Sequence, residues 1–297
     1  MRKQHWLLYA VITVLAWGLW GALIDTPARA GFPETLGYIV WSLTMIPPCL
    51  VAMALADWKL ETDLRSVIYG CLAGFLGAGG QLVLFKVLRL APAYLVFPFI
   101  SLSPLVTILL ALVISRERAS FKGWIGIALA LVAGLLLAYA PPEGHGGGGL
   151  LWVGLALLVF LAWGLQGFVI SHGNKTMRAE SIFFYMTLTG LLLIPVAWVM
   201  TDFHQPINWG FKGPWLAAMI QLLNAVGALL LVYSFRYGRA IIVSPLINAG
   251  APVVTIVISL LIFRTVPLAV QGVGMIVAII ATLLMSLEEE VECSAKA

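Results

Sequence analysis

The sequence predicts an all-α polytopic membrane protein, with ten transmembrane helices arranged as two inverted five-helix repeats. Three observations lead to this prediction: the hydrophobicity of the chain, its division into apolar runs of spanning length, and a motif that occurs twice. Of the 297 residues, 62% are hydrophobic and 10% are charged, and the mean hydropathy is +1.03. Soluble domains carry roughly a quarter charged residues, so this composition excludes an ordinary soluble domain.

Apolar runs of about 20 residues, the length that crosses a ~30 Å hydrocarbon core, recur along the whole chain. Turn-forming residues separate them, as at Pro27 to Pro33, at Asp57 to Asp63 and at Ala91-Pro92. The first run is too long for a signal-peptide core, so we interpret it as a retained helix. The predicted spans are 5–24, 36–56, 67–88, 93–114, 121–140, 150–171, 181–201, 213–235, 240–262 and 267–287.

The repeated motif lies inside the first and sixth predicted spans. Residues 15–21 read LAWGLWG and residues 161–167 read LAWGLQG, so that Trp20 corresponds to Gln166. At helical spacing Trp17 and Trp20 share a face, and the glycines form a neighbouring face on which another helix can approach closely. We therefore predict two structural repeats, residues 1–145 and 146–297, joined at the glycine-rich loop 146–149.

The correspondence between the halves continues beyond this motif. Residues 87–98 align with 234–245, and Pro104 and Gly126 match Pro252 and Gly274 with a one-residue slip. Paired prolines and arginines are rare in membrane helices, which makes this match harder to attribute to general hydrophobicity than the apolar identities around it.

Lysine and arginine predict the orientation. With the N-terminus inside, the inner segments hold twelve of them and the outer segments five, namely Arg29, Lys86, Arg89, Lys212 and Arg264. This asymmetry places both termini in the cytoplasm. Five helices per half then require the two halves to enter the membrane in opposite directions, which is the inverted-repeat topology of many secondary transporters.

Together these features resemble the EamA-type permeases of the drug/metabolite transporter superfamily. The resemblance is carried by the two five-helix halves, the Trp-Gly repeat, the turn at 89–93, the proline-bearing fourth span and the Arg-Glu-Arg turn at 116–118. It implies an inner-membrane permease that moves small metabolites, with the first four helices of each half lining a central cavity. The second half departs from the pattern, because Phe263-Arg264-Thr265 lacks a counterpart of Glu117.

Candidate cavity-lining residues come from stripes of small and amide side chains. In the third span Gly70, Gly74, Gly77 and Gln81 lie on one face, and the corresponding positions of the eighth are Ala217, Gln221, Asn224 and Ala228. An unpaired amide is costly in hydrocarbon, so these groups should face the bundle interior or water. The alternative is that the amides join helices by hydrogen bonds without touching a ligand.

The fourth and ninth spans give a second pair of stripes. Tyr94, Phe97 and Ser101 correspond to Ile241, Ser244 and Asn248, and prolines interrupt both helices. Proline removes a rung of the helical hydrogen-bond ladder and leaves carbonyls free, as at transporter binding sites and hinges. The predicted substrate-binding residues are Trp17, Trp20, Gln81, Tyr94, Phe97, Ser101, Trp163, Gln166, Gln221, Asn224, Ser244 and Asn248, and the predicted hinges are Pro98, Pro104, Pro245 and Pro252.

An uncharged, aromatic and amide-rich lining suits a zwitterion or a neutral or weakly cationic solute, since tryptophan faces attract ammonium groups. We expect a permease that exports amino acids or related compounds by alternating access, its direction resting on the resemblance. Uptake of a quaternary amine such as choline, or of a sugar, is the alternative, and a membrane scaffold subunit is the non-transport alternative. Proton coupling, facilitated diffusion and exchange all remain open.

An enzyme is not expected, because no paired acids, Ser–His pair or metal-ligand cluster falls at membrane depth. The sequence predicts no cofactor, metal or nucleic-acid partner. Its expected partners are the lipid bilayer and a small-molecule substrate. The stripe from Gly70 to Gly74 could pack helices within one chain or between two, so both a monomer and a homodimer fit.

Overall fold

The computed structural model describes residues 5–90, 96, 100–139, 151–264 and 266–295. Every regular element that it describes within these ranges is a helix. In chain order they are α1 (Trp6–Leu23), α2 (Asp25–Arg29), α3 (Glu34–Thr44), α4 (Ile46–Leu55), α5 (Leu64–Leu90), α7 (Pro104–Val113), α8 (Phe121–Ala138), α9 (Leu151–Gly173), α10 (Ala179–Leu192), α11 (Ile194–Met200), the π-helical turn η2 (Phe211–Trp215), α12 (Leu216–Tyr237), α13 (Ala240–Phe263) and α14 (Ala269–Ala295).

The described helices confirm an all-α polytopic membrane protein. Eight segments are long and apolar enough to cross a membrane: Trp6–Arg29, Glu34–Leu55, Leu64–Leu90, Phe121–Ala138, Leu151–Gly173, Ala179–Met200, Phe211–Tyr237 and Ala240–Ile262. Two shorter apolar helices, Pro104–Val113 and Ala269–Met285, fall within the two remaining predicted spans.

Four of these segments consist of two helical pieces. The segment Trp6–Arg29 divides into α1 and α2, Glu34–Leu55 into α3 and α4, Ala179–Met200 into α10 and α11, and Phe211–Tyr237 into η2 and α12. In α4 and α11, prolines occupy the first turn, where their missing N–H groups are not needed. The predicted spans 36–56, 181–201 and 213–235 were each expected to be one continuous helix, whereas the first predicted span ends at residue 24, next to the end of α1.

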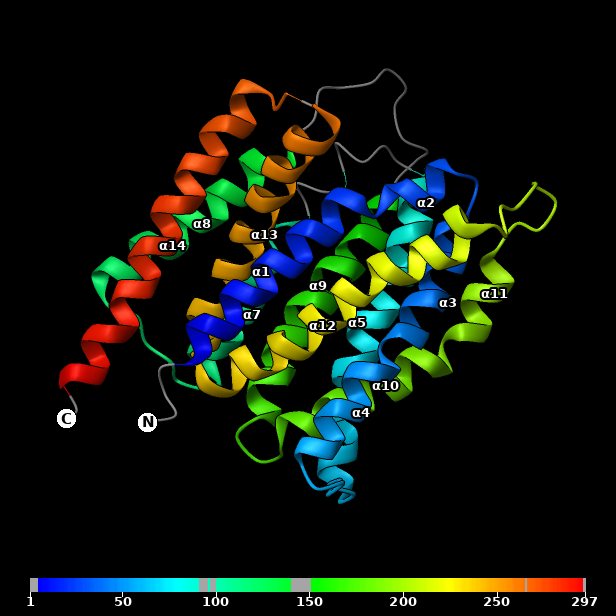
Figure 1. Cartoon of the computed structure of the whole chain (residues 1–297). Coiled ribbons are helices and arrows are strands. Elements are labelled where there is room, and N and C mark those ends of the chain that lie inside the picture. Colours follow the sequence, from blue (N-terminus) through cyan, green and yellow to red (C-terminus); the bar gives the residue numbers. More distant parts are fainter. Residues whose placement is uncertain (1–4, 91–95, 97–99, 140–150, 265, 296–297) are drawn as a thin grey trace.

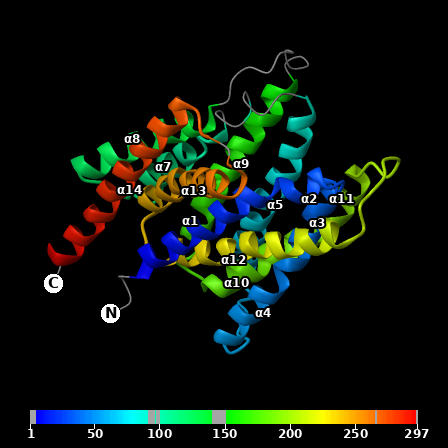
Figure 2. The ribbon, with the colours of Figure 1, turned by 45° about the horizontal axis from the view of Figure 1, so that its top comes forward.

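Helices from the two halves of the chain interleave. Helix α1 packs against α12 and α13, and α9 packs against α5 and α7. Helix α8 lies along α14, and both views show this pair at one edge of the molecule (Figures 1 and 2). Each copy of the Trp-Gly motif therefore contacts helices of the opposite half.

Two contacts show how close these helices come. A Cβ atom added at Gly18 would lie 2.4 Å from Cβ of Val254, and one added at Gly164 would lie 2.4 Å from Cβ of Val106. Next to these glycines, threonine hydroxyls cross the interface. Thr255 Oγ1 donates to Gly18 O at 3.0 Å, and Thr107 Oγ1 donates to Gly164 O at 2.7 Å.

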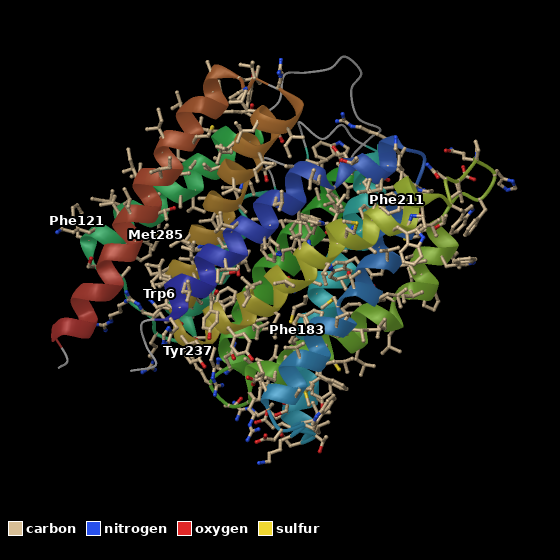
Figure 3. All side chains as sticks on the ribbon, in the orientation of Figure 1. Trp6, Phe121, Phe183, Phe211, Tyr237 and Met285 are labelled. Carbon is tan, nitrogen blue, oxygen red and sulfur yellow. The ribbon has the colours of Figure 1, made fainter. Side chains whose placement is uncertain are left out.

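One end of the bundle holds the start of α1 and the end of α14 (Figures 1 and 2). We call it the basic end, because the connections 56–63, 114–120, 174–178 and 238–239 meet there and carry Lys59, Arg116, Arg118, Lys175, Arg178 and Arg239. Trp6 and Tyr237 lie near this end, whereas Phe211 lies at the opposite end of the bundle (Figure 3).

Candidate functional site

Three tryptophans and two amides meet where α1, α3 and α12 come together. Trp20 Nε1 donates to Oε1 of Gln221 at 2.9 Å, and Trp41 Nε1 donates to Oδ1 of Asn224 at 2.9 Å. Trp17 Nε1 donates to the backbone carbonyl of Asn224 at 3.2 Å. We call these five residues the amide cluster. The spacing of three along α1 and along α12 places each pair on one face, as the sequence predicted.

The indoles fix the orientation of both amides. An indole N–H can only donate, so the amide atom that faces it must be the oxygen. With the oxygens occupied, the NH₂ groups of Gln221 and Asn224 remain as donors, and no described residue accepts a hydrogen bond from either. Gln221 is only 7% exposed, but its Nε2 is not among the fully buried polar atoms without a partner, so water or a ligand can reach this donor. The amide cluster therefore has two NH₂ groups that can donate hydrogen bonds to water or a ligand.

The second motif copy meets α5 instead. Trp163 Nε1 donates to the carbonyl of Gly77 at 3.3 Å, the position that corresponds to Asn224 in the repeat. Gln166 lies directly on this glycine, because a Cβ atom at Gly77 would be 2.1 Å from its Nε2. Gln81 is partly buried on the same helix, and its side chain makes no hydrogen bond to a described residue.

The glycines nearer the start of α5 face another helix. A Cβ atom at Gly70 would lie 2.6 Å from Cβ of Tyr185, and one at Gly74 would lie 1.8 Å from Oγ1 of Thr189, both on α10. The stripe Gly70-x-x-x-Gly74 thus packs helices within one chain.

The predicted stripes on the fourth and ninth spans are only partly described. Tyr94, Phe97 and Pro98 lie outside the described residues. Ser101 is partly buried beside Gly134 of α8, and Ser244 is 5% exposed. Asn248 is exposed and its Nδ2 donates to the carbonyl of Ser244 at 2.9 Å. The hydrogen bond of Asn248 stays within α13, whereas those of the amide cluster join α1, α3 and α12.

The prolines divide into two kinds. Pro104 is the first residue of α7, where it leaves no helical bond unmade. Pro245 and Pro252 lie inside the continuous helix α13. Because proline has no N–H, the carbonyls of Ile241 and Asn248 lack their usual helical hydrogen bond. The predicted hinge role of all three stays a prediction.

Sequence reasoning missed Trp41, which completes the cluster. Its helix also carries Tyr38 and Ser42, whose hydroxyls both donate to the carbonyl of Gly190 at 3.1 Å. Three polar side chains at spacings of three and four in an apolar run need buried partners. That pattern was the available signal.

Hydrogen bonds between connections link the helices at the basic end. Glu117 Oε2 accepts from the backbone N–H of Ile241 at 3.1 Å, at the first turn of α13. Burial raises the pKa of Glu117. The hydrogen bond from the backbone N–H of Ile241 and the positive charges of Lys175 and Arg239 lower this pKa and so oppose the rise. Arg239 donates in turn to the carbonyl of Arg118. These contacts tie the turn before α8 to the turn before α13.

Comparison with known protein families identifies the family of this chain. The model of the EamA-like transporter family matches residues 4–139 and again residues 150–287. The chain is a member of the EamA-like transporter family. The two matches fall on the two halves predicted from the repeated motif.

Relatives of this family member are distant. It is 29% identical over 81 residues to a probable 4-amino-4-deoxy-L-arabinose-phosphoundecaprenol flippase subunit ArnE of Hamiltonella defensa, which covers 27% of this chain and 73% of the relative. It is 27% identical over 101 residues to an uncharacterized protein of Methanocaldococcus jannaschii, covering 34% and 74% of the two chains. A protein crystal structure matches with a TM-score of 0.71 at 18% identity, covering 96% of this chain and 98% of that one, which shows the fold alone.

Proposed function

We propose that this EamA family member is a secondary transporter that exports amino acids or related small metabolites by alternating access. Membership of a transporter family supports transport. The observation that carries the substrate class is the amide cluster, where two amide NH₂ groups lie among three indoles and no described acceptor takes them.

The chemistry of the cluster matches a zwitterion. Amide donors bind a carboxylate without placing a fixed charge in the membrane, and such a charge would be expensive there. Indole faces attract an ammonium group. A neutral amino acid offers both groups a few ångströms apart, so the five residues of the cluster can bind it whole. Gln81, Ser101, Trp163, Gln166, Ser244 and Asn248 complete the proposed substrate pathway from the other helices.

The proposed architecture is ten transmembrane helices in two inverted repeats, residues 1–145 and 146–297. Equivalent contacts on both sides support it. Trp17 and Trp163 each donate to a backbone carbonyl of the opposite half, and Gly18 and Gly164 each receive a valine and a threonine from it. Rocking of one repeat against the other would open the cluster to each side of the membrane in turn.

The proposed location is the inner membrane, with both termini in the cytoplasm. The start of α1 and the end of α14 share the basic end (Figures 1 and 2), and lysine and arginine are enriched in cytoplasmic connections. The hydrogen bonds around Glu117 would then belong to the cytoplasmic gate.

Uptake of choline or of a sugar remains the alternative, because both would also use aromatic faces and uncharged hydrogen-bonding groups. Flipping of a lipid-linked amino sugar is a second candidate, favoured by the flippase subunit among the relatives. A scaffold subunit without transport would leave the two amide donors unexplained. An enzyme is not proposed.

Counterflow in proteoliposomes tests the proposal. Proteoliposomes that contain the purified protein are loaded with unlabelled neutral amino acids, choline or sugars. Uptake of the corresponding labelled solute is then followed with and without a pH gradient. The wild type should exchange neutral amino acids. Gln221→Leu should lose at least about tenfold in apparent affinity, because a hydrogen bond to a charged group contributes about 1.5–3 kcal/mol.

Gln205→Leu is the matched control, because Gln205 is exposed in a connection and, within the described residues, its side chain bonds only to Asp202. It should exchange as the wild type does. Equal exchange by Gln221→Leu and the control would show that the amide cluster only joins helices. Exchange of sugars or choline and not of amino acids would replace the proposed substrate by the alternative.

A further inference from the structure

A small pocket lies at the basic end, away from the amide cluster. It has a volume of about 210 Å³ and is formed by the end of α4, the first turn of α10 and the last turn of α12. Its lining includes Leu55, Arg178, Glu180, Tyr233, Arg236 and Tyr237. Sites for whole small molecules measure about 300–1,000 Å³, so this pocket suits a smaller group that is part of a larger ligand.

Two guanidinium groups in the pocket keep donors for a ligand. Arg178 Nη1 donates to the carbonyl of Ala56 at 3.4 Å, and Arg236 Nη1 donates to the carbonyls of Asn174 and Met177. Among the described residues, Nη2 of either arginine has no acceptor. Arginine presents its N–H groups in a fork that matches phosphate oxygens.

Two carboxylates balance these cations. Glu61 Oε1 lies 3.9 Å from Nε of Arg178, and Glu180 Oε1 accepts from the hydroxyl of Tyr233 at 2.7 Å. The second oxygen of Glu180 has no described donor, so it can accept from an ammonium group. Two positive and two negative groups favour a ligand that carries both charges over one with net negative charge.

The outer face of α4 leads into this pocket. Pro47, Leu50, Val51, Ala54 and Leu55 are exposed at spacings of three and four, so they form one apolar stripe on the bundle surface. Leu55 is 75% exposed and also lines the pocket. Trp58 is exposed just beyond it, and tryptophan is enriched at membrane interfaces. An acyl chain lying along the stripe would therefore bring its headgroup to the two arginines.

We propose that this pocket binds the headgroup of a phospholipid that carries a phosphate and a primary ammonium. Arg178 and Arg236 hold the phosphate, and Glu180 accepts from the ammonium. The acyl chain lies along the outer face of α4. The site is independent of the proposed transport activity, and it selects an ethanolamine headgroup because a trimethylated amine cannot donate to Glu180.

The test is native mass spectrometry of the full chain in detergent, titrated with ethanolamine, choline and glycerol phospholipids of identical chains. The ethanolamine lipid should bind about tenfold more tightly than the other two. Free phosphoethanolamine at equal concentration should compete poorly, because it lacks the chain that α4 contacts.

Two variants divide the roles of the pocket. Glu180→Gln keeps an oxygen for Tyr233, and it should abolish the preference for ethanolamine over choline while choline-lipid binding stays unchanged. Arg178→Gln should weaken all three lipids about tenfold. Lys59→Gln is the control, since Lys59 is a cation of the same end that pairs with Asp57 outside the pocket.

Three results would overturn the proposal. The first is tighter binding of the glycerol lipid, which would indicate attraction to the basic end as a whole. The second is an ethanolamine preference that survives in Glu180→Gln, and the third is equal competition by free phosphoethanolamine. Thermal unfolding of each variant in parallel separates a lost site from a lost fold.

Discussion

Replacing Gly164 by alanine tests the contact that brings the motif helix α9 to α7. The added Cβ atom would lie 2.4 Å from Cβ of Val106 and 2.5 Å from the carbonyl oxygen of Ser103. Ordinary contacts between such atoms are about 3.5–4.0 Å. Because a Cβ atom and a backbone oxygen cannot rotate away, the two helices must separate by roughly 1 Å.

The expected cost follows from three contributions. Overpacking of this kind destabilises by about 1–3 kcal/mol, and the rigid neighbours place this site in the upper part of that range. Separation also weakens the bond from Thr107 to the carbonyl of Gly164, worth about 0.6 kcal/mol in a membrane. Alanine returns up to about 1 kcal/mol of helix propensity. The net loss is about 2 kcal/mol.

The assay is the free energy of unfolding, measured by titrating the purified protein in mixed micelles with sodium dodecyl sulfate. Gly154→Ala is the control on the same helix, since a Cβ atom there meets nothing within 4 Å. It should be neutral or stabilising. Gly18→Ala should cost as much as Gly164→Ala, because its Cβ atom would lie 2.4 Å from Val254 and 3.0 Å from the carbonyl oxygen of Ala251.

A Gly164→Ala protein as stable as Gly154→Ala would refute the reasoning, since the close approach would then not exist. Adding Val106→Ala should fail to rescue Gly164→Ala, because the Cβ atom of residue 106 that makes the contact remains. Full rescue would place the conflict at the valine methyl groups instead.

The shifted pKa values of two carboxylates predict how the stability of the protein depends on pH. Burial raises the folded pKa of Glu117 above its ordinary value of 4.5, so the folded chain binds this proton more tightly than the unfolded chain. Relative to Glu117→Gln, the wild type should therefore gain melting temperature as pH falls from neutral toward 4.5, and parallel curves would contradict the assignment. Hydrogen bonds from Ser66 lower the pKa of Asp63 at the start of α5, so its stabilisation should be present at neutral pH and lost as pH falls through the lowered value. The difference in melting temperature between wild type and Asp63→Ala should shrink on acidification, and a constant difference would show that the ionised cap contributes nothing.

Hydropathy predicted the eight segments that are long and apolar enough to cross a membrane, because a polar backbone in hydrocarbon must be satisfied within each helix and only long apolar runs allow that. It did not predict the breaks inside the spans. The break between α3 and α4 falls at Met45, just before Pro47, and a proline in an apolar run is equally consistent with a kink, a break or a first turn. Tertiary packing decides among these three outcomes, and it cannot be inferred from the sequence of one apolar segment.

The sequence predicted which helix faces carry the residues of the candidate site, but not which helices those faces contact. Periodicity put Gln221 and Asn224 on one side of α12, and this follows from helix geometry alone. Which helix covers that side depends on how the halves interleave. Trp41 was therefore missed, although it donates to Asn224 at 2.9 Å. A stripe shows which side chains share a direction, whereas a hydrogen bond also needs the position of a second helix.

The asymmetry between the two motif copies explains why the amide donors gather on one side. Where the first copy has Trp20, its partner helix supplies the amide of Gln221. Where the second copy has Gln166, its partner supplies Gly77, and any side chain there would collide with that amide. The α1–α12 interface thus has the amides of Gln221 and Asn224 on the partner helix, whereas the α5–α9 interface has the amide of Gln166 on the motif helix. Because the indole of Trp41 also orients the amide of Asn224, a strong binding site is expected at the α1–α3–α12 junction, with only a weaker one at its α5–α9 counterpart.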